Sequence, residues 1–308
     1  MCDLTNPIFT NVTKAREHLE SLRWADGRFC PHCGATEETS FVRGKKHRPG
    51  LYYCNACKMQ FTVTIGTIFE RSKIPLNKWM LAFHLMSSSK KGVSAHQLHR
   101  SLGVTYKTAW FMAHRIRECM RPASTKTPLG GEGKAVEADE TYIGGKEKNK
   151  HRSKRTSAIG GQGKEVVFSL VERGGMVRSQ HVANVSGKTL RPIIKAQIDH
   201  KSILMTDEAG QYREVGLEFA RHEKVNHGIE EYVRGDAHTN TVEGYFSILK
   251  RGITGVYHHV SQAHLKRYLA EFDFRYNERS SLGVTDAERA AKAIKGAEGK
   301  RLTYQRPA

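Results

Sequence analysis

The segment Ala135–Ile143, with the sequence AVEADETYI, decides the fold of the largest part of this chain. It reads as a strand, and we expect its Asp139 to be a strand-end aspartate. Residues 165–171 predict a second strand, Gly174 and Gly175 predict a hairpin turn, and residues 176–185 predict a third strand. This region therefore begins as a run of three strands.

A helix and a fourth strand follow. Ser186 is expected to cap a helix that runs through Ile198. Ile203 begins a short buried strand that ends at Asp207, and helices are expected after it. Three strands, a helix, a strand and then helices indicate a mixed α/β domain with a central sheet.

Three carboxylates in this region point to chemistry. Asp139 and Asp207 are expected at strand ends, and Glu243 lies on a predicted helix with 35 residues between it and Asp207. Two strand-end aspartates and one helix glutamate can hold a pair of hard divalent cations, because such ions prefer oxygen ligands. A pair of this kind can drive in-line attack on a phosphodiester.

Each carboxylate also has a plain structural interpretation. Asp139 and Asp207 could simply end strands in solvent, and the glutamate that follows each of them receives no metal role. Asn240 could cap the helix, and Glu243, three residues later, could then close a capping box. On spacing alone, the ligand and the capping interpretations of Glu243 are about equally supported.

Composition narrows the class of partner. The 308 residues include 50 Lys and Arg against 31 Asp and Glu, a formal net charge of +19. That excess favours a polyanionic partner, most simply nucleic acid, over a charge that serves solubility alone. The sequence has no apolar run long enough for a membrane span and no signal-peptide core, so we expect a soluble, intracellular protein without a membrane partner.

Two cysteine pairs predict a structural zinc site. Cys30 and Cys33 form the first pair, and Cys54 and Cys57 form the second. Two residues between thiolates let both sulfurs face one ion, and four thiolates close a tetrahedral coordination sphere. A small β-rich ribbon buries little apolar area, so the metal must supply much of its folding free energy. Such ribbons bind DNA, RNA or protein, so this motif does not choose a partner.

A helical segment with the pattern of a helix-turn-helix follows. Ser94 is expected to cap a short helix that ends at Gly103, and Thr105 to cap a longer helix, Tyr106–Met120. Two helices joined through glycine are typical of this motif, although a plain helical linker is the alternative. The cations of the second helix that we expect to contact DNA are Lys107, Arg115 and Arg117.

Two basic stretches lie near the carboxylates in sequence. Six of the ten residues 146–155 are basic, which predicts an exposed loop that can lie along a phosphate backbone, or else a solvated flexible loop. A second basic pair follows Glu243 by two helical turns. The residues expected to contact DNA in these stretches are Lys146, Lys148, Lys150, Arg152, Lys154, Arg155, Lys250 and Arg251.

Prolines and glycines between residues 122 and 133 indicate a linker. We therefore expect a zinc ribbon in residues 1–72 and a helix-turn-helix-like segment in residues 73–121. The linker of residues 122–133 leads to a catalytic domain in residues 134–280. A helix and a polar tail make up residues 281–308.

An ordered set of sequence phrases resembles the DDE transposases of bacterial insertion sequences that carry an amino-terminal zinc ribbon. The phrases cover nearly the whole chain in order. They are GTIFE at 66–70, DETYIGG at 139–145, TDE at 206–208, HTNTVEGYFSILKRG at 238–252, YHHVS at 257–261 and FDFRYN at 272–277.

The resemblance implies an RNase H-like core and a transposase with a two-metal mechanism. Asp139 and Asp207 would bind or bridge two Mg²⁺ or Mn²⁺ ions, and Glu243 would complete the second site. Water, and then a freed DNA 3′-hydroxyl, would attack phosphorus in line. The implied partner is double-stranded DNA, as element ends and as target, bound by a homodimer or larger assembly.

The implied location is the bacterial cytoplasm, with the protein on the nucleoid when it is bound to DNA. Two rival functions remain open at this point. One is a DNA-binding regulator, derived from a transposase, that uses the ribbon and the helix-turn-helix without chemistry. The other is a metal-dependent nuclease that cuts DNA without joining it.

Overall fold

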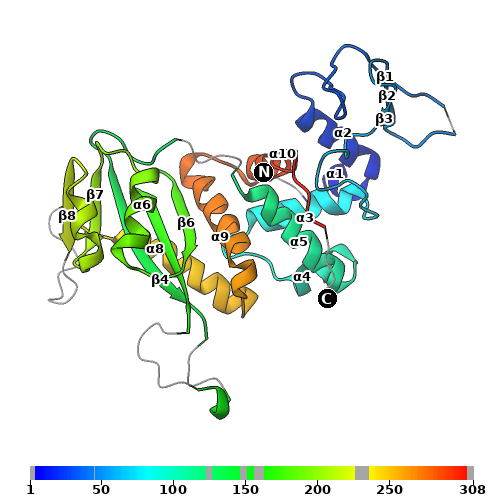
Figure 1. Cartoon of the computed structure of the whole chain (residues 1–308). Coiled ribbons are helices and arrows are strands. Elements are labelled where there is room, and N and C mark those ends of the chain that lie inside the picture. Colours follow the sequence, from blue (N-terminus) through cyan, green and yellow to red (C-terminus); the bar gives the residue numbers. More distant parts are fainter. Residues whose placement is uncertain are drawn as a thin grey trace. The chain divides into compact units, whose positions relative to one another are not determined.

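The structure is a computed structural model that describes residues 4–44, 46–122, 127–145, 151–155, 163–225 and 236–303. The chain forms two compact units (Figure 1). One unit combines Met1–Arg121 with Glu278–Ala308, and we call it the terminal unit. The other is Pro122–Asn277, and we call it the central unit.

A five-stranded mixed sheet forms the middle of the central unit, with the strand order β6-β5-β4-β7-β8. β5 runs antiparallel to β4 and β6, whereas β7 runs parallel to β4 and β8. This topology is RNase H-like, as the sequence predicts. The strands are β4 (Ala135–Ile143), β5 (Glu165–Glu172), β6 (Val177–Val182), β7 (Ile203–Asp207) and β8 (Arg221–Val225).

Helices cover both faces of this sheet (Figure 1). Side chains alternate along β4, so Val136 and Ala138 join the core cluster that contains α6 and α7, whereas Ile143 joins the cluster that contains α8 and α9. The elements on the first face are α6 (Gly187–Gln197), η3 (Gly210–Tyr212) and α7 (Arg213–Gly216). Those on the second are α8 (Asn240–Gly252), the π-helical turn η5 (Ile253–Tyr257) and α9 (Gln262–Asn277).

Two buried polar networks hold α9 in place on the second face. The Tyr245 hydroxyl of α8 donates to Asp273 Oδ1 at 2.6 Å, and the Ser179 N–H of β6 donates to Asp273 Oδ2 at 2.8 Å. The Tyr257 hydroxyl of η5 donates to Glu271 at 2.7 Å, and Arg275 pairs with the same carboxylate. The phrase FDFRYN therefore includes Asp273, which links α9 to α8, the helix of Glu243, and the phrase YHHVS includes Tyr257, which links α9 to η5.

The predicted linker differs from the structure in its second half. Leu129 is 1% exposed and belongs to the core of the central unit, and its N–H donates to the Gln197 carbonyl at 2.7 Å. A single leucine among prolines and glycines gave no periodic pattern, so its burial was not predicted. Residues 123–126 lie outside the described residues.

The terminal unit contains the ribbon and a group of helices. The three-stranded ribbon sheet has the order β1-β2-β3, and Trp24 packs against Tyr52 and Phe61 of this sheet. The ribbon strands are β1 (Thr39–Phe41), β2 (Tyr52–Cys54) and β3 (Gln60–Phe61). The helices are α1 (Pro7–Thr10), α2 (Val12–Arg23), α3 (Leu76–Ser88), α4 (Ala95–Leu102), α5 (Tyr106–Met120) and α10 (Asp286–Lys295), with the short η6 (Ser280–Leu282) before the last.

The two helices and the turn that suggested a helix-turn-helix form as the sequence predicts. The Ser94 side chain accepts the Gln97 N–H at 3.1 Å and caps α4, and Thr105 caps α5 by accepting the Thr108 N–H at 3.2 Å. Gly103 ends α4 with φ 58°, a left-handed conformation that favours glycine. The helices of this motif are therefore fixed by local capping.

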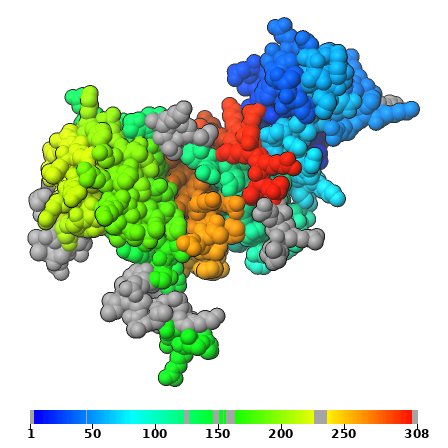
Figure 2. Space-filling view, in the orientation of Figure 1, coloured from blue at the N-terminus to red at the C-terminus, as the bar shows by residue number. Residues whose placement is uncertain are grey.

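Residues 286–300 belong to the terminal unit, contrary to the separate carboxy-terminal segment that the sequence indicates. In Figure 2 the red carboxy-terminal residues lie against the blue and cyan residues of the same unit. The Ile68 N–H donates to the Ala297 carbonyl at 3.3 Å, and the Gly299 N–H donates to the Gly66 carbonyl at 2.9 Å. The phrase GTIFE therefore pairs with the backbone of residues 297 and 299.

Gly296 tests this packing. A β-carbon at this position would lie 2.2 Å from the Cys119 carbonyl oxygen. We expect Gly296→Ala to lower the free energy of unfolding of the terminal unit by about 1–3 kcal/mol, the usual cost of overpacking. Urea denaturation measures it. Gly255→Ala, where an added β-carbon meets nothing within 4 Å, is the control and should unfold like the wild type.

No helix in the described ranges is long and apolar enough to cross a membrane.

Candidate metal centres and DNA-contacting residues

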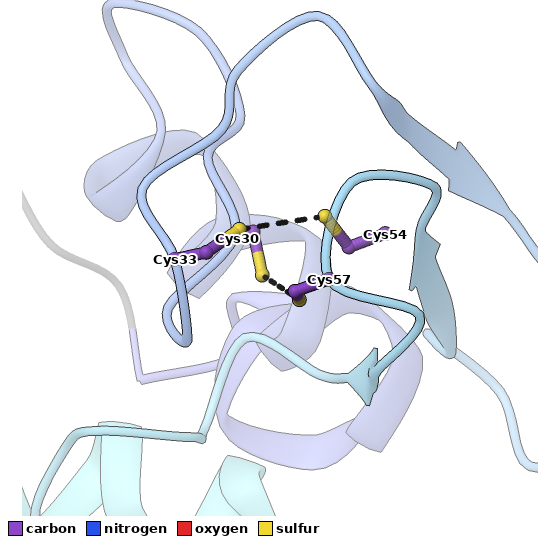
Figure 3. A group of neighbouring side chains, drawn as sticks. All are labelled: Cys30, Cys33, Cys54 and Cys57. Atoms are coloured by element: carbon purple, nitrogen blue, oxygen red, sulfur yellow. Dashed lines mark hydrogen bonds between the residues drawn. The ribbon is translucent and has the colours of Figure 1, made fainter.

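The four cysteines of the ribbon converge on one point (Figure 3). Their sulfur atoms all lie within 4.8 Å of one another, with 3.7 Å between Cys30 and Cys57 and 3.6 Å between Cys33 and Cys54. A tetrahedral zinc ion with bonds of about 2.3 Å needs sulfurs about 3.8 Å apart. The four thiolates therefore fit a structural zinc ion, as predicted.

Backbone hydrogen bonds shape both cysteine turns. The Gly34 N–H donates to the Cys30 carbonyl at 2.8 Å, and the Cys54 N–H donates to the Met59 carbonyl at 3.0 Å. Gly34 has φ 81°, which favours glycine in the first turn. These local contacts define the backbone turns that carry the two cysteine pairs.

Strand register aligns the two aspartates of the central unit. β4 and β7 are parallel, and Glu137 pairs with Met205. Continuing the register by two residues places Asp139 beside Asp207. Asp207 ends β7, as predicted, whereas Asp139 lies in the middle of β4 because β4 continues along β5 to Ile143. The expectation that Asp139 ends its strand is therefore wrong.

Glu243 lies in the first turn of α8, and the capping box suggested by its spacing is not formed. The residue before the helix is Thr239, not Asn240, which makes Glu243 the fourth helical residue. A capping box needs the third. The Thr239 side chain makes no cap and instead donates from Oγ1 to Glu243 Oε1 at 2.9 Å. Glu243 is exposed, so its carboxylate is accessible to a ligand.

Electrostatics connects the three carboxylates. The pKa of Asp139 is raised to about 7, first by burial and then by the carboxylates of Glu140, Asp207 and Glu243. The Glu140 N–H, which donates to Asp139 Oδ1 at 2.7 Å, lowers the same pKa. Bringing like charges together in a partly buried place is costly unless a cation compensates them. The cluster is thus a place where a cation would be stabilised.

The donor chemistry of this cluster suits Mg²⁺ or Mn²⁺, which prefer hard oxygen ligands. The four cysteines are the one group within the described ranges whose ligand atoms all lie within 4.8 Å of one another. Asp139, Asp207 and Glu243 are therefore spread more widely than the ligands of a single closed site. Ligands arranged around two ions about 3.5–4 Å apart need not all lie that close together.

The glutamates next to the aspartates have different surroundings. Glu140 lies on the opposite face of β4 from Asp139, where it accepts hydrogen bonds from the Tyr212 hydroxyl and from Gln211 Nε2. Glu208 follows β7 and is exposed. The contacts of Glu140 agree with leaving that residue without a metal role.

Glu137, two residues before Asp139, is a buried carboxylate whose role the sequence did not predict. Glu137 is 0% exposed and accepts hydrogen bonds from Arg173 Nε at 2.7 Å, Thr241 Oγ1 at 2.8 Å and the Val242 N–H at 2.9 Å. The available signal was a two-residue spacing, which puts Glu137 and Asp139 on the same face of one strand.

The predicted DNA contacts of the second helix divide into one exposed and two packed residues. Lys107 is exposed at the start of α5. Arg115 donates to the Ile68 carbonyl at 2.7 Å and to the Leu302 carbonyl at 3.1 Å, and Arg117 is 2% exposed. Arg115 and Arg117 therefore pack within the terminal unit, and DNA contact by these two residues stays a prediction.

The basic stretches near the carboxylates are partly described. Arg152 and Arg155 are exposed, whereas Lys146, Lys148 and Lys150 and the side chain of Lys154 lie outside the described residues. Lys250 and Arg251 are exposed in the last turn of α8, and Arg251 Nε donates to Ser247 Oγ at 3.1 Å. These exposed cations remain candidates for phosphate contact.

Comparison with known proteins gives matches over both units. The family described as ISXO2-like transposase domain matches residues 128–277, and the transposase zinc-ribbon domain matches residues 13–60. The uncharacterized protein in transposable element ISH50 of Halobacterium salinarum is 30% identical over 280 residues, which cover 87% of this chain and 91% of that protein.

A solved structure gives a much weaker match. It is a chain from the structure of the simian T-cell lymphotropic virus intasome in complex with the PP2A regulatory subunit B56 gamma. The TM-score is 0.28 and the identity 15%, over 57% of this chain and 63% of that chain. The sequence matches carry the assignment: this chain belongs to the ISXO2-like transposases and has their zinc-ribbon domain.

Proposed function

We propose that this transposase cuts DNA at the ends of an insertion sequence and joins the cut ends to target DNA. Asp139, Asp207 and Glu243 would hold two Mg²⁺ or Mn²⁺ ions. The proposal is supported by the adjacent parallel strands β4 and β7, which carry Asp139 and Asp207, and by the electrostatic interaction of Asp139 with both Asp207 and Glu243. When bound, two such ions stabilise both the incoming and the departing oxygen of an in-line displacement.

Other features of the chain position the metal ligands and supply positive charge for DNA. Asp139 and Asp207 lie on the adjacent parallel strands β4 and β7, and Glu243 in the first turn of α8 contributes to the raised pKa of Asp139. Rigid placement favours catalysis because the ligands need no reorganisation when charge develops in the transition state. Arg152, Arg155, Lys250 and Arg251 supply positive charge that can bind phosphates. No covalent bond between the chain and DNA is required.

The direct test is incubation of zinc-loaded protein with Mg²⁺ and DNA that carries the candidate element ends. We expect strand cleavage at the ends, detected on a sequencing gel. Tight binding without cleavage in either Mg²⁺ or Mn²⁺ would instead support the non-catalytic regulator. Inverted repeats that flank the coding region, with short target duplications outside them, independently favour the transposase.

Pairing of two DNA ends favours at least a homodimer during the reaction. We also infer that the protein acts on DNA in the cytoplasm. A reaction stopped after cleavage would identify a nuclease, so joining of pre-cut ends to a target separates the two enzymatic possibilities.

DNA binding through α4 and α5 predicts a specific effect at Lys107. Residues near the start of the second helix of a helix-turn-helix contact DNA. If Lys107 contacts one phosphate, Lys107→Ala should weaken binding and reduce the slope of log affinity against log salt by about 0.9. Fluorescence anisotropy at several salt concentrations measures this. Lys14→Ala, at an exposed lysine of α2 paired with Glu17, is the matched control and should leave the slope unchanged.

A further inference from the structure

Helix α8 is capped from outside its own sequence. The residue before it, Thr239, makes no side-chain cap, so the first turn needs another acceptor for its N–H groups. Glu137 Oε2 on β4 accepts the Val242 N–H at 2.9 Å, and its Oε1 accepts the Thr241 hydroxyl at 2.8 Å. A carboxylate at this end of a helix is also favoured by the helix dipole.

Arg173 completes the arrangement from the end of β5. Its Nε donates to Glu137 Oε1 at 2.7 Å, its Nη1 to the Asp236 carbonyl at 2.7 Å and its Nη2 to the His238 carbonyl at 2.8 Å. One guanidinium therefore binds the buried carboxylate and the backbone that leads into α8. Arginine suits this role because its fork of donors has a fixed geometry.

The pair connects the backbones that carry two proposed metal ligands. Glu137 lies two residues before Asp139 on the same face of β4, and Val242 immediately precedes Glu243 in α8. The hydrogen bonds of Glu137 thus fix the start of α8 against the strand of Asp139. Thr239, freed from capping, donates to Glu243 at 2.9 Å and adds a second constraint on that side chain.

We propose that Glu137 and Arg173 are positioning residues that set Glu243 relative to Asp139. Neither residue is assigned a contact with the metal or with DNA. This inference rests on the proposed function, because the pair positions metal ligands only if Asp139 and Glu243 bind metal. A buried ion pair adds little net stability but can fix one geometry. Groups that orient metal ligands typically affect metal affinity by about 10- to 100-fold.

The test uses full-length, zinc-loaded protein and Mn²⁺ titration followed by electron paramagnetic resonance. We expect Glu137→Gln to weaken Mn²⁺ binding by about 10- to 100-fold. Gln keeps the size of the side chain but loses the charge that holds Arg173 and the first turn of α8. Thermal unfolding shows whether each variant is folded under the conditions of the titration.

A matched control separates positioning from stability. Glu271 and Arg275 form another buried pair in the same unit, with side chains 0% and 5% exposed, but they bind η5 rather than the first turn of α8. Glu271→Gln should lower the melting temperature and leave Mn²⁺ affinity within about twofold of the wild type.

A milder pair of variants avoids any folding problem at Glu137. Thr241→Val removes one hydrogen bond to Glu137 and should weaken Mn²⁺ binding, whereas Thr241→Ser should retain wild-type affinity.

A double variant tests whether Glu137 acts through Glu243. Addition of Glu137→Gln to Glu243→Gln should cause no further loss of Mn²⁺ affinity. Full additivity, or wild-type affinity in both folded Glu137→Gln and Thr241→Val, would overturn the positioning role while the metal site stands. Equal Mn²⁺ binding by the wild type and Asp139→Asn would instead overturn the proposed metal site and the positioning role together.

Discussion

Replacement of Asp139 by Asn is expected to abolish cleavage and joining while DNA binding remains. The substitution keeps the size of the side chain but removes the charge that Asp139 contributes beside Asp207 and Glu243. Loss of about 4 kcal/mol of transition-state stabilisation corresponds to about a thousandfold in rate, so we expect a decrease of at least that size. Gel assays of cleavage and anisotropy measurements of binding test the two halves of this prediction.

Asp207→Asn should have the same effect, because parallel register places it beside Asp139. Glu208→Gln removes the neighbouring exposed carboxylate and is the matched control, with a cleavage rate expected within a few fold of the wild type. Undiminished cleavage by either aspartate variant would refute the catalytic assignment.

Loss of one zinc ligand is expected to unfold the ribbon. Structural zinc contributes about 10–16 kcal/mol in zinc-finger peptides, and the core around this site is small. Its buried members are Cys30, Tyr52, Cys54 and Phe61. Cys30→Ser should therefore reduce bound zinc from one ion per chain to nearly none, and it should weaken binding to element ends.

Metal analysis and anisotropy measure these two effects. Cys119→Ser makes the same replacement at another buried cysteine of the terminal unit, outside the group of four, and should retain zinc. Retention of zinc by Cys30→Ser would contradict the four-thiolate site. Normal binding of element-end DNA by the zinc-free variant would indicate that the ribbon has another role, such as contact with protein.

Sequence predicted the elements that have strong local signals. Ala135–Ile143 forms a strand with the predicted bounds, and Tyr106–Met120 forms the predicted helix after the Thr105 cap. The order of strands and helices was sufficient for a mixed α/β domain with a central sheet, and the resemblance supplied the RNase H-like core. Four closely spaced cysteines were sufficient for zinc. In each case the pattern depends on residues that are near one another in the chain.

Other features depend on contacts that are distant in sequence. β8 has the sequence RHEKV, whose single aliphatic residue gives no strand pattern, and it forms because β7 supplies a parallel partner. The burial of Arg117 was not predicted, because charge alone does not reveal it. The capping alternative for Glu243 was undecided because the true cap, Glu137, lies more than 100 residues earlier.

Metal-dependent DNA joining that requires Asp139 is tested most directly with a labelled, pre-cut element end and a plasmid target. We expect a covalent joint product with wild-type protein and Mg²⁺, and no product with Asp139→Asn or in the presence of a chelator. Joining at the wild-type rate by Asp139→Asn, or in the chelator, would contradict this expectation.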